Sequence, residues 1–137
     1  MISLLQYLGP WVNHPDFTDD IETNSLSLLM WVSKLIEIME KDGVIFPINP
    51  NTKSIVAGNK YGGFRPQACS QGAPKSAHKL GLAVDIWDPE NKIDEWLMDH
   101  QPLLTALGIY IEHPDYTKGW SHWSIKAPKS GHHVFIP

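Results

Sequence analysis

The sequence predicts an α+β fold in which helices flank a small, mostly antiparallel sheet. Two segments show the apolar spacing of amphipathic helices, and several short β-prone runs are separated by turn residues. Helical and β-prone segments do not alternate regularly, which argues against a parallel α/β sheet. A chain of 137 residues is long enough to bury one core, so we expect a single domain over residues 1–137.

The first helix is expected over about residues 18–42. Apolar side chains recur at spacings of three and four between Leu26 and Met39. A threonine and acidic residues precede this pattern and Gly43 follows it, as is typical of helix boundaries.

A second helical segment is expected between Pro89 and Gly108. Pro89 suits the first turn of a helix, and Gly108 suits the position just past its end. Pro102 lies inside the segment and lacks the N–H that a helix interior needs, so we expect it to kink or split the helix.

Strands are expected in the segments that remain. Prolines, asparagines and glycines follow the first helix and leave only short extended pieces, near residues 44–46, 53–57 and 62–65. Stronger β-prone runs cover residues 82–87, 109–113 and 119–127. We therefore place the core over about residues 44–126 and expect a C-terminal tail, residues 127–137, that ends in a short edge strand.

The composition limits the partners to consider. The formal net charge is −4, with 11 basic and 15 acidic residues and no basic run, so we expect no nucleic-acid and no membrane partner. The N-terminal residues lack a basic leader, and no apolar stretch approaches the length of a transmembrane helix, so we expect a chain made in a cytoplasm without a signal peptide. Nothing in the sequence predicts an oligomer, and we assume a monomer.

The stretch KSAHKLGLAVDI, residues 75–86, places a histidine and an aspartate seven positions apart. Gly81 lies between them and permits the backbone to turn, so that His78 and Asp85 can approach one ion. Asp85 lies in an otherwise apolar run, and a buried carboxylate is costly unless it is paired or binds a metal. Spacing alone leaves two alternatives open: His78 and Asp85 pair with each other, or Asp85 caps the helix that follows Pro89.

A third candidate ligand, His122, lies in the run GWSHWSI. Alternation along a strand places it on one face with Trp120 and Ser124. Two histidines and one aspartate leave the fourth position of a tetrahedral zinc ion open to water, as in catalytic zinc sites. The tryptophans near these residues either line a groove for a peptide or glycan or pack as a wall; they are Trp87, Trp120 and Trp123.

Cys69 and the adjacent His132 and His133 are also capable of chemistry. Cys69 has no partner for an internal disulfide and lies in a loop-like stretch, so it is either a semi-buried loop residue or a thiol nucleophile. We expect both histidines to be exposed in the tail and not to form a second metal site.

Four motifs carry a resemblance to a known family. SAHKLGLAVDI resembles the S-x-H-x-x-G-x-A-x-D signature of the D-alanyl-D-alanine carboxypeptidase-like zinc peptidases, which share a fold with the hedgehog signalling domain. YGGFRP is similar to the arginine-bearing segment upstream of that signature, GWSHW matches the closing W-x-H, and PKSGHHVFIP resembles the tail of phage-encoded members. The resemblance spans about residues 44–137 and implies a hedgehog/DD-peptidase-like fold and a phage endolysin-type member.

The resemblance implies that one Zn²⁺ ion is bound by His78, Asp85 and His122. It implies that Arg65 meets a substrate carboxylate or carbonyl, which a guanidinium suits because it can bind both oxygens of a carboxylate. The alternative for Arg65 is a surface salt bridge. The resemblance also implies that Ser76 holds the site through hydrogen bonds, unless it is an ordinary turn serine.

One departure from the family pattern concerns the general base. Several members carry a catalytic acid three positions before the last histidine ligand, where this chain has Gly119. We expect Glu112 to be the base, since phage-type relatives carry a glutamate in the same Y-x-E context, and Asp115 is the second choice. A base must reach the reacting water by a hydrogen bond of about 2.6 to 3.2 Å. Alternation does not decide whether Glu112 faces the cleft.

The resemblance implies a zinc-dependent peptidase that hydrolyses an amide bond in the peptide stem of bacterial peptidoglycan, as a carboxypeptidase or an endopeptidase. A phage-type lysis enzyme of this kind is made in the host cytoplasm and acts on the cell wall after release. The alternative is a non-catalytic zinc-bearing module of the same fold that binds cell wall or a protein. A third possibility is a structural component of a phage particle with local wall-degrading activity.

Overall fold

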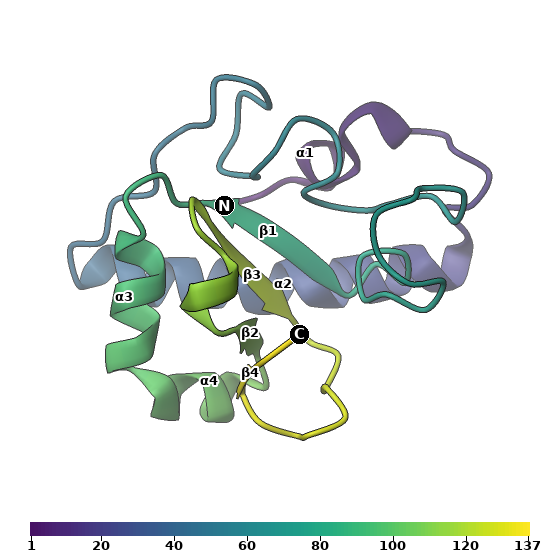
Figure 1. The fold of residues 1–137 in the computed structure, drawn as a ribbon. Helices are drawn as coiled ribbons and strands as arrows, with labels where there is room; N and C mark the ends of the chain where they lie inside the picture. Colours follow the sequence, from purple (N-terminus) through teal and green to yellow (C-terminus); the bar gives the residue numbers. More distant parts are fainter.

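The computed structural model describes residues 1–137 and confirms the α+β class. Four helices accompany one four-stranded sheet with the strand order β1-β3-β2-β4 (Figure 1). The helices are α1 (Leu4–Leu8), α2 (Asp19–Lys41), α3 (Lys92–Asp99) and α4 (Gln101–Leu107), with two short 3₁₀ helices, η1 (Gly9–Trp11) and η2 (Pro114–Tyr116). The strands are β1 (Ala83–Trp87), β2 (Tyr110–Glu112), β3 (Trp120–Ser124) and β4 (Val134–Phe135).

The sheet is mixed. β3 pairs antiparallel with β1 and with β2, whereas β4 pairs parallel with β2. The short edge strand expected in the tail is present as β4. The tail therefore forms part of the sheet.

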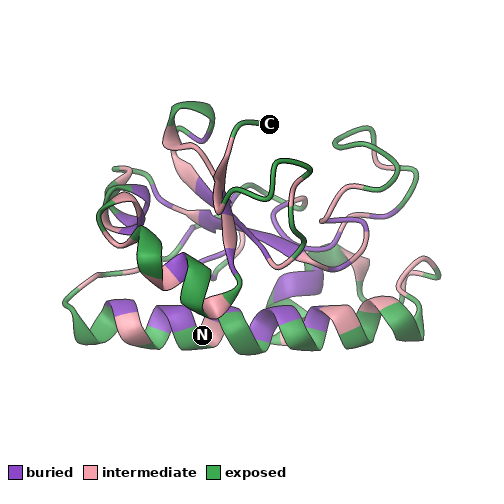
Figure 2. Ribbon diagram, turned by 90° about the horizontal axis from the view of Figure 1, so that it is seen from below, coloured by how far each residue is buried: buried purple, intermediate pink, exposed green.

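Helix α2 covers one face of the sheet and leaves the other face open. Figure 2 shows α2 running along the bottom of the view, below the strands, with buried and exposed residues alternating along it. Its apolar side packs in one core cluster with alternate residues of the strands, among them Val84, Ile86, Ile111 and Trp123. Side chains alternate between the two faces of a strand, so the neighbours of these residues face away from α2.

The long helix forms where the spacing predicts it. Thr18 is the N-cap of α2, and its hydroxyl accepts a hydrogen bond from the backbone N–H of Ile21. Acidic residues in the first turn and Lys41 in the last turn favour the helix dipole. None of the helices has the length and hydrophobicity that a membrane-spanning segment requires.

The second helical segment is split, as Pro102 predicts. α3 ends at Asp99 and α4 begins at Gln101, because Pro102 cannot donate the hydrogen bond that a continuous helix needs. The N-cap residue of α3, Asn91, makes no side-chain cap, and the carboxylate that bonds to the helix start is that of Asp88 and not of Asp85. Its two carboxylate oxygens accept from the backbone N–H groups of the helix's first turn, at 3.0 and 2.9 Å.

The three extended pieces expected between residues 44 and 65 are not regular strands. Only isolated bridges occur there, from Asn49 to Ser54 and from Val56 to Ile86. Pro47 and Pro50 withhold N–H groups from any ladder in this stretch. Residues 55–62 instead hydrogen-bond to the outer edge of β1, with Ala57 donating to the Asp85 carbonyl at 2.8 Å. This loop therefore covers the open edge of the sheet.

The short helix α1 has no counterpart in the sequence prediction, because five residues are too few to show a helical period. Ser3 and Gln6 form a reciprocal capping box at its start. The hydroxyl of Tyr7, which is buried, donates to the backbone carbonyl of Ala83 at 2.9 Å. α1 is thus tied directly to β1.

A second buried carboxyl group, on Asp94 of α3, lies next to the loop that precedes β3. Oδ2 accepts a hydrogen bond of 2.7 Å from the hydroxyl of Thr117, whereas Oδ1 is buried without a hydrogen-bond partner. Burial raises the pKa of the Asp94 carboxyl to about 6, and the hydrogen bond from Thr117 opposes part of this rise. The folded protein therefore disfavours the charged form of Asp94.

Replacing Asp94 by Asn is expected to stabilise the fold at alkaline pH. Because the folded pKa is raised above the unfolded value, the contribution of Asp94 to stability is fully present below about pH 4 and is lost as pH rises through about 6. The free energy of unfolding of Asp94→Asn, relative to wild type, should rise by about 1 kcal/mol between pH 5 and pH 8. Urea unfolding at both pH values measures this difference, with the exposed Asp99→Asn as control. Equal differences at pH 5 and pH 8 would contradict it.

Candidate metal centre and cleft

The candidate site is built on one row of residues that crosses the sheet. Asp85 on β1 pairs with His122 on β3, and Glu112 on β2 pairs with Phe135 on β4. Tyr110 pairs with Ser124 on β3, so the same antiparallel register continued by two residues brings Glu112 opposite His122. Strands lie about 4.8 Å apart. The register alone therefore brings an aspartate, a histidine, a glutamate and a phenylalanine into line.

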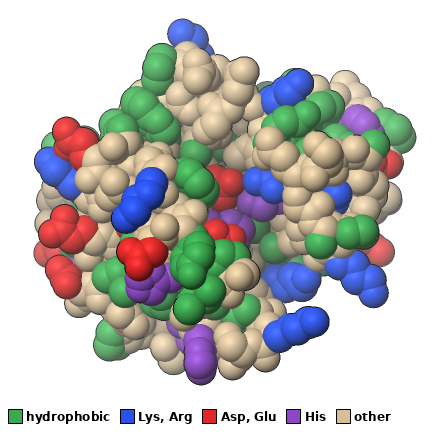
Figure 3. Space-filling view, in the orientation of Figure 1, with side chains coloured by type: hydrophobic (Ala, Val, Ile, Leu, Met, Phe, Trp, Pro, Cys, Tyr) green, Lys and Arg blue, Asp and Glu red, His purple; other side chains and the backbone are tan.

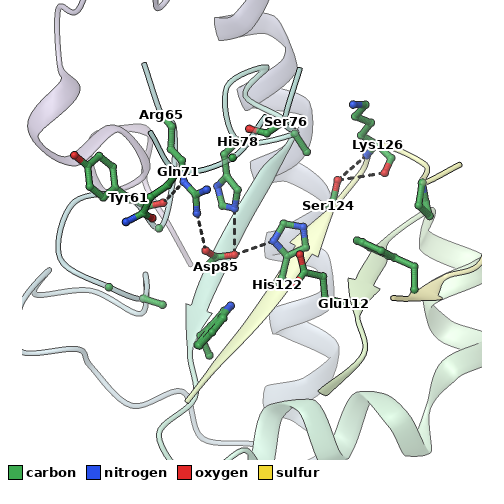
Figure 4. A pocket seen from close by; sticks show the side chains of 18 of the residues that line it. Tyr61, Arg65, Gln71, Ser76, His78, Asp85, Glu112, His122, Ser124 and Lys126 are labelled. Carbon is green, nitrogen blue, oxygen red and sulfur yellow. Dashed lines mark hydrogen bonds and ion pairs between the residues drawn. The ribbon is translucent and has the colours of Figure 1, made fainter. Parts of the chain in front are cut away.

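The carboxylate of Asp85 is the centre of the site, and its two oxygens have different partners. Oδ2 forms a salt bridge of 3.3 Å with Nη2 of Arg65. Oδ1 lies 2.9 Å from Nδ1 of His122 and 3.2 Å from Nε2 of His78 (Figure 4). The Asp85 side chain is only 12% exposed, so this set of partners compensates a charge that has largely left water.

His78 is held by backbone on the loop that contains Arg65. Its Nδ1 lies 2.8 Å from the carbonyl oxygen of Gly63 and must carry a hydrogen to bond there. Nε2 is therefore the ring nitrogen that points at Asp85, and it is the one available to a metal ion. A Cβ at Gly63 would overlap the carbonyl of Tyr7, so this close approach requires glycine.

The turn between His78 and β1 also requires a glycine. Gly81 has φ of +72°, and a Cβ there would lie 2.5 Å from the Ser25 hydroxyl of α2. The seven-residue gap between His78 and Asp85 is therefore closed by a left-handed turn packed against α2. This agrees with the role that spacing predicts for Gly81.

His78, Asp85 and His122 form a buried group that could hold a metal ion, with their ligand atoms all within 4.8 Å of one another. Two ligand atoms that are each about 2.0 to 2.1 Å from a tetrahedral zinc ion lie about 3.3 Å apart. The 2.9 and 3.2 Å separations around Oδ1 of Asp85 are close to that value. The residues therefore fit a small cation in donor chemistry, and the two distances to Asp85 fit it in spacing.

The electrostatics of the group favour a charged aspartate. Burial alone would raise the pKa of Asp85, but the charges and hydrogen bonds of His78 and His122 hold that pKa well below its usual range. Burial lowers the pKa of His122, but the hydrogen bond to Asp85 and the charges of Asp85 and Glu112 outweigh it and raise that pKa above its ordinary value. The site thus has a strong preference for positive charge beside Asp85.

A cleft of about 700 Å³ opens above this group on the face of the sheet opposite α2. Figure 3 shows histidine and acidic side chains at the bottom of a depression between two parts of the molecule, with lysine and arginine side chains along one side. His78, Asp85 and His122, the candidate metal-binding group, all line it, together with Arg65 and Glu112. Five of the predicted site residues are therefore brought together.

The two candidates for the general base, Glu112 and Asp115, differ in whether they line the cleft. Glu112 lines the cleft beside His122, and its side chain is visible next to that ring in Figure 4. Asp115 is exposed on η2, where it lies 3.9 Å from Lys118, and it does not line the cleft. Gly119 lines the cleft but offers no acid. Of the two candidates, only Glu112 thus lies in the cleft with His78, Asp85 and His122.

Several other expectations are resolved. Trp87 and Trp120 line the cleft, but Trp123 is fully buried in the core and packs against Phe46.

His133 is not an exposed tail residue: its Nδ1 lies 2.7 Å from the Ile109 carbonyl oxygen, and its ring stacks on Tyr110 at 4.2 Å. The tail is held there because β4 pairs with β2. His132 is exposed, as expected, and Cys69 does not line the cleft.

Sequence reasoning missed Lys79, the residue that follows His78. Lys79 is 3% exposed, and its ammonium donates to the backbone carbonyls of Gln67, Cys69 and Gly72 at 3.2, 2.8 and 3.2 Å. These bonds hold the loop that carries Gln71 and Gly72 into the cleft. No local sequence pattern marks this role, because the three acceptors are backbone carbonyls of a separate loop.

The structure predicts that metal binding depends on Asp85 and His122. We expect wild type to bind one equivalent of Zn²⁺ or Co²⁺. Asp85→Asn, which replaces the charged ligand by a neutral amide, and His122→Ala, which removes a ligand, should each weaken binding by at least about 100-fold. Isothermal titration with each metal measures the affinity. Metal at 100 times its dissociation constant should also stabilise wild type by about 2.7 kcal/mol.

The matched control for this prediction is His132→Ala, which removes an exposed histidine outside the group. It should bind metal as wild type does. Unchanged affinity in Asp85→Asn and His122→Ala would show that the metal binds elsewhere.

Comparisons with protein-family models, with curated proteins and with solved structures found no match to this chain. The function proposed for it therefore rests on its own residues, on their geometry and on the motif resemblance.

Proposed function

We propose that this chain is a zinc-dependent peptidase that hydrolyses an amide bond in the peptide stem of bacterial peptidoglycan, as a carboxypeptidase or an endopeptidase. The observation that carries the proposal is the row across the sheet, in which Glu112 lies beside the His78–Asp85–His122 group on the wall of one cleft. The resemblance to D-alanyl-D-alanine carboxypeptidase-like peptidases supplies the substrate, the zinc and the phage-type lysis role.

Zinc bound to the three residues would supply a Lewis acid for the scissile carbonyl and a water molecule of lowered pKa. Glu112 accepts a proton from the attacking water and returns it to the leaving amine, as a carboxylate general base does. Its neighbour Phe135 places a ring edge against His122, with centroids 6.0 Å apart, and shields that side of the site from water.

Arg65 contributes in two ways under this proposal. Its Nη2 fixes Oδ2 of Asp85, and its Nε donates to the Tyr61 carbonyl at 2.8 Å, so the guanidinium is held in one orientation. Its remaining N–H groups are available to a substrate carbonyl or carboxylate at the cleft wall. Arg65 thereby couples the orientation of a metal ligand to substrate contact.

Glu112→Gln is expected to lower the rate of wall digestion by about 10²- to 10⁴-fold while the protein keeps its zinc, because glutamine cannot accept the proton. Release of new amino and carboxyl termini from purified peptidoglycan measures the rate, and metal analysis measures the zinc. Asp115→Asn is the matched control and should digest wall as wild type does, since Asp115 lies outside the cleft.

The same experiment tests the alternative of a non-catalytic binding module. Zinc-loaded wild type that releases no termini from several wall chemotypes, yet binds wall fragments, would replace the peptidase proposal with that module. Loss of activity in Asp115→Asn with full activity in Glu112→Gln would reverse the assignment of the base.

A further inference from the structure

The cleft differs in chemical character at its two ends. Along the β1–β3 pair, Trp87 and Trp120 face each other at one end and Asp85 and His122 lie in the middle. The opposite end is marked by Ser124, which also lines the cleft. Successive residues on one face of a strand are about 7 Å apart, so each end lies about 7 Å from the metal-binding group. The cleft therefore runs from an aromatic end to an end formed by the segment after β3.

Two lysines line the cleft at the second end. Lys126 and Lys129 lie on the connection between β3 and β4 and contribute to the cleft wall. The third basic side chain of the cleft, Arg65, is already paired with Asp85, whereas neither lysine forms a salt bridge with a carboxylate. The chain has a net charge of −4, so the excess of basic side chains on this side of the cleft is local (Figure 3).

Lys126 is exposed at the cleft wall and is oriented by two hydrogen bonds. Its ammonium donates to the Lys75 carbonyl at 2.8 Å, and its backbone N–H donates to the Ser124 hydroxyl at 2.9 Å. An ammonium has three N–H donors, so two remain for a ligand. Fixing the side chain in advance lowers the entropy cost of binding. In Figure 4, Ser124 and Lys126 lie on the opposite side of the metal-binding group from Arg65 and Tyr61.

We propose that the Lys126–Lys129 end of the cleft is an anion subsite that binds a free carboxylate of the substrate on one side of the scissile amide. The inference rests on the proposed peptidase function and specifies its substrate class. An extended peptide advances about 3.4 Å per residue, so a carboxylate bound there lies within about two residues of the cleaved bond. The uncharged part of the substrate lies toward Trp87 and Trp120. The preferred substrate is thus an acidic peptide with its charge on a defined side.

The test compares two synthetic peptides that span the amide which zinc-loaded wild type cleaves in purified peptidoglycan, as identified by mass spectrometry. One peptide carries free carboxylates next to that amide, and the other carries carboxamides at the same positions. In the double variant Lys126→Met, Lys129→Met, kcat/KM for the carboxylate peptide should fall at least about tenfold, mainly through KM, because a charge-assisted hydrogen bond is lost. For the carboxamide peptide it should change less than about twofold.

The control is Lys118→Met, an exposed lysine that does not line the cleft, which should cleave both peptides as wild type does. Equal cleavage of both peptides by wild type, or an equal loss on both in the double variant, would overturn the anion subsite while leaving the peptidase proposal standing. Failure of zinc-loaded wild type to cleave any wall or peptide would overturn the peptidase function, and the subsite with it.

Discussion

The buried carboxylate of Asp85 is the interaction on which the rest of the site depends. It joins three separate parts of the chain, because Arg65 comes from the loop after α2, His78 from the glycine turn and His122 from β3. An unpaired charge buried to this extent would cost several kcal/mol. The Asp85 carboxylate stays charged and buried because its partners compensate that cost. Both histidines lie beside the same oxygen, Oδ1 of Asp85, so a cation is best accommodated next to that oxygen.

The register of the strand pairs determines which residues line the cleft and in what order they follow along it. The pairing of Asp85 with His122 fixes which residues of β1 and β3 face the open side, and α2 occupies the other side. Alternate residues of both strands therefore line the cleft wall: Trp87 and Asp85 on β1, and Trp120, His122 and Ser124 on β3. The parallel addition of β4 extends the row with Phe135. A one-residue slip in either pairing would move the whole set into the core.

The parts of this arrangement that depend on local pattern could be predicted from the sequence. Apolar spacing predicts α2, Pro102 predicts the split helix, and an acid inside an apolar run predicts a buried, compensated Asp85. The remainder depends on contacts between distant segments. The buried ammonium of Lys79 and the stacking of His133 on Tyr110 leave no local pattern, because their partners are backbone carbonyls or rings many residues away.

The backbone conformation at residue 119 explains why the proposed base does not lie at that position. Gly119 has φ of +91°, a conformation in which a glutamate side chain would be strained, and its carbonyl accepts from the N–H of Asp88 at 3.1 Å. An acid at that position would therefore require a different turn before β3. On the neighbouring strand β2, Glu112 continues the row past His122 in ordinary extended backbone, so a carboxylate there requires no backbone strain. A base that approaches from β2 therefore adds no carboxylate at the Trp87–Trp120 end of the cleft, where the wall is aromatic.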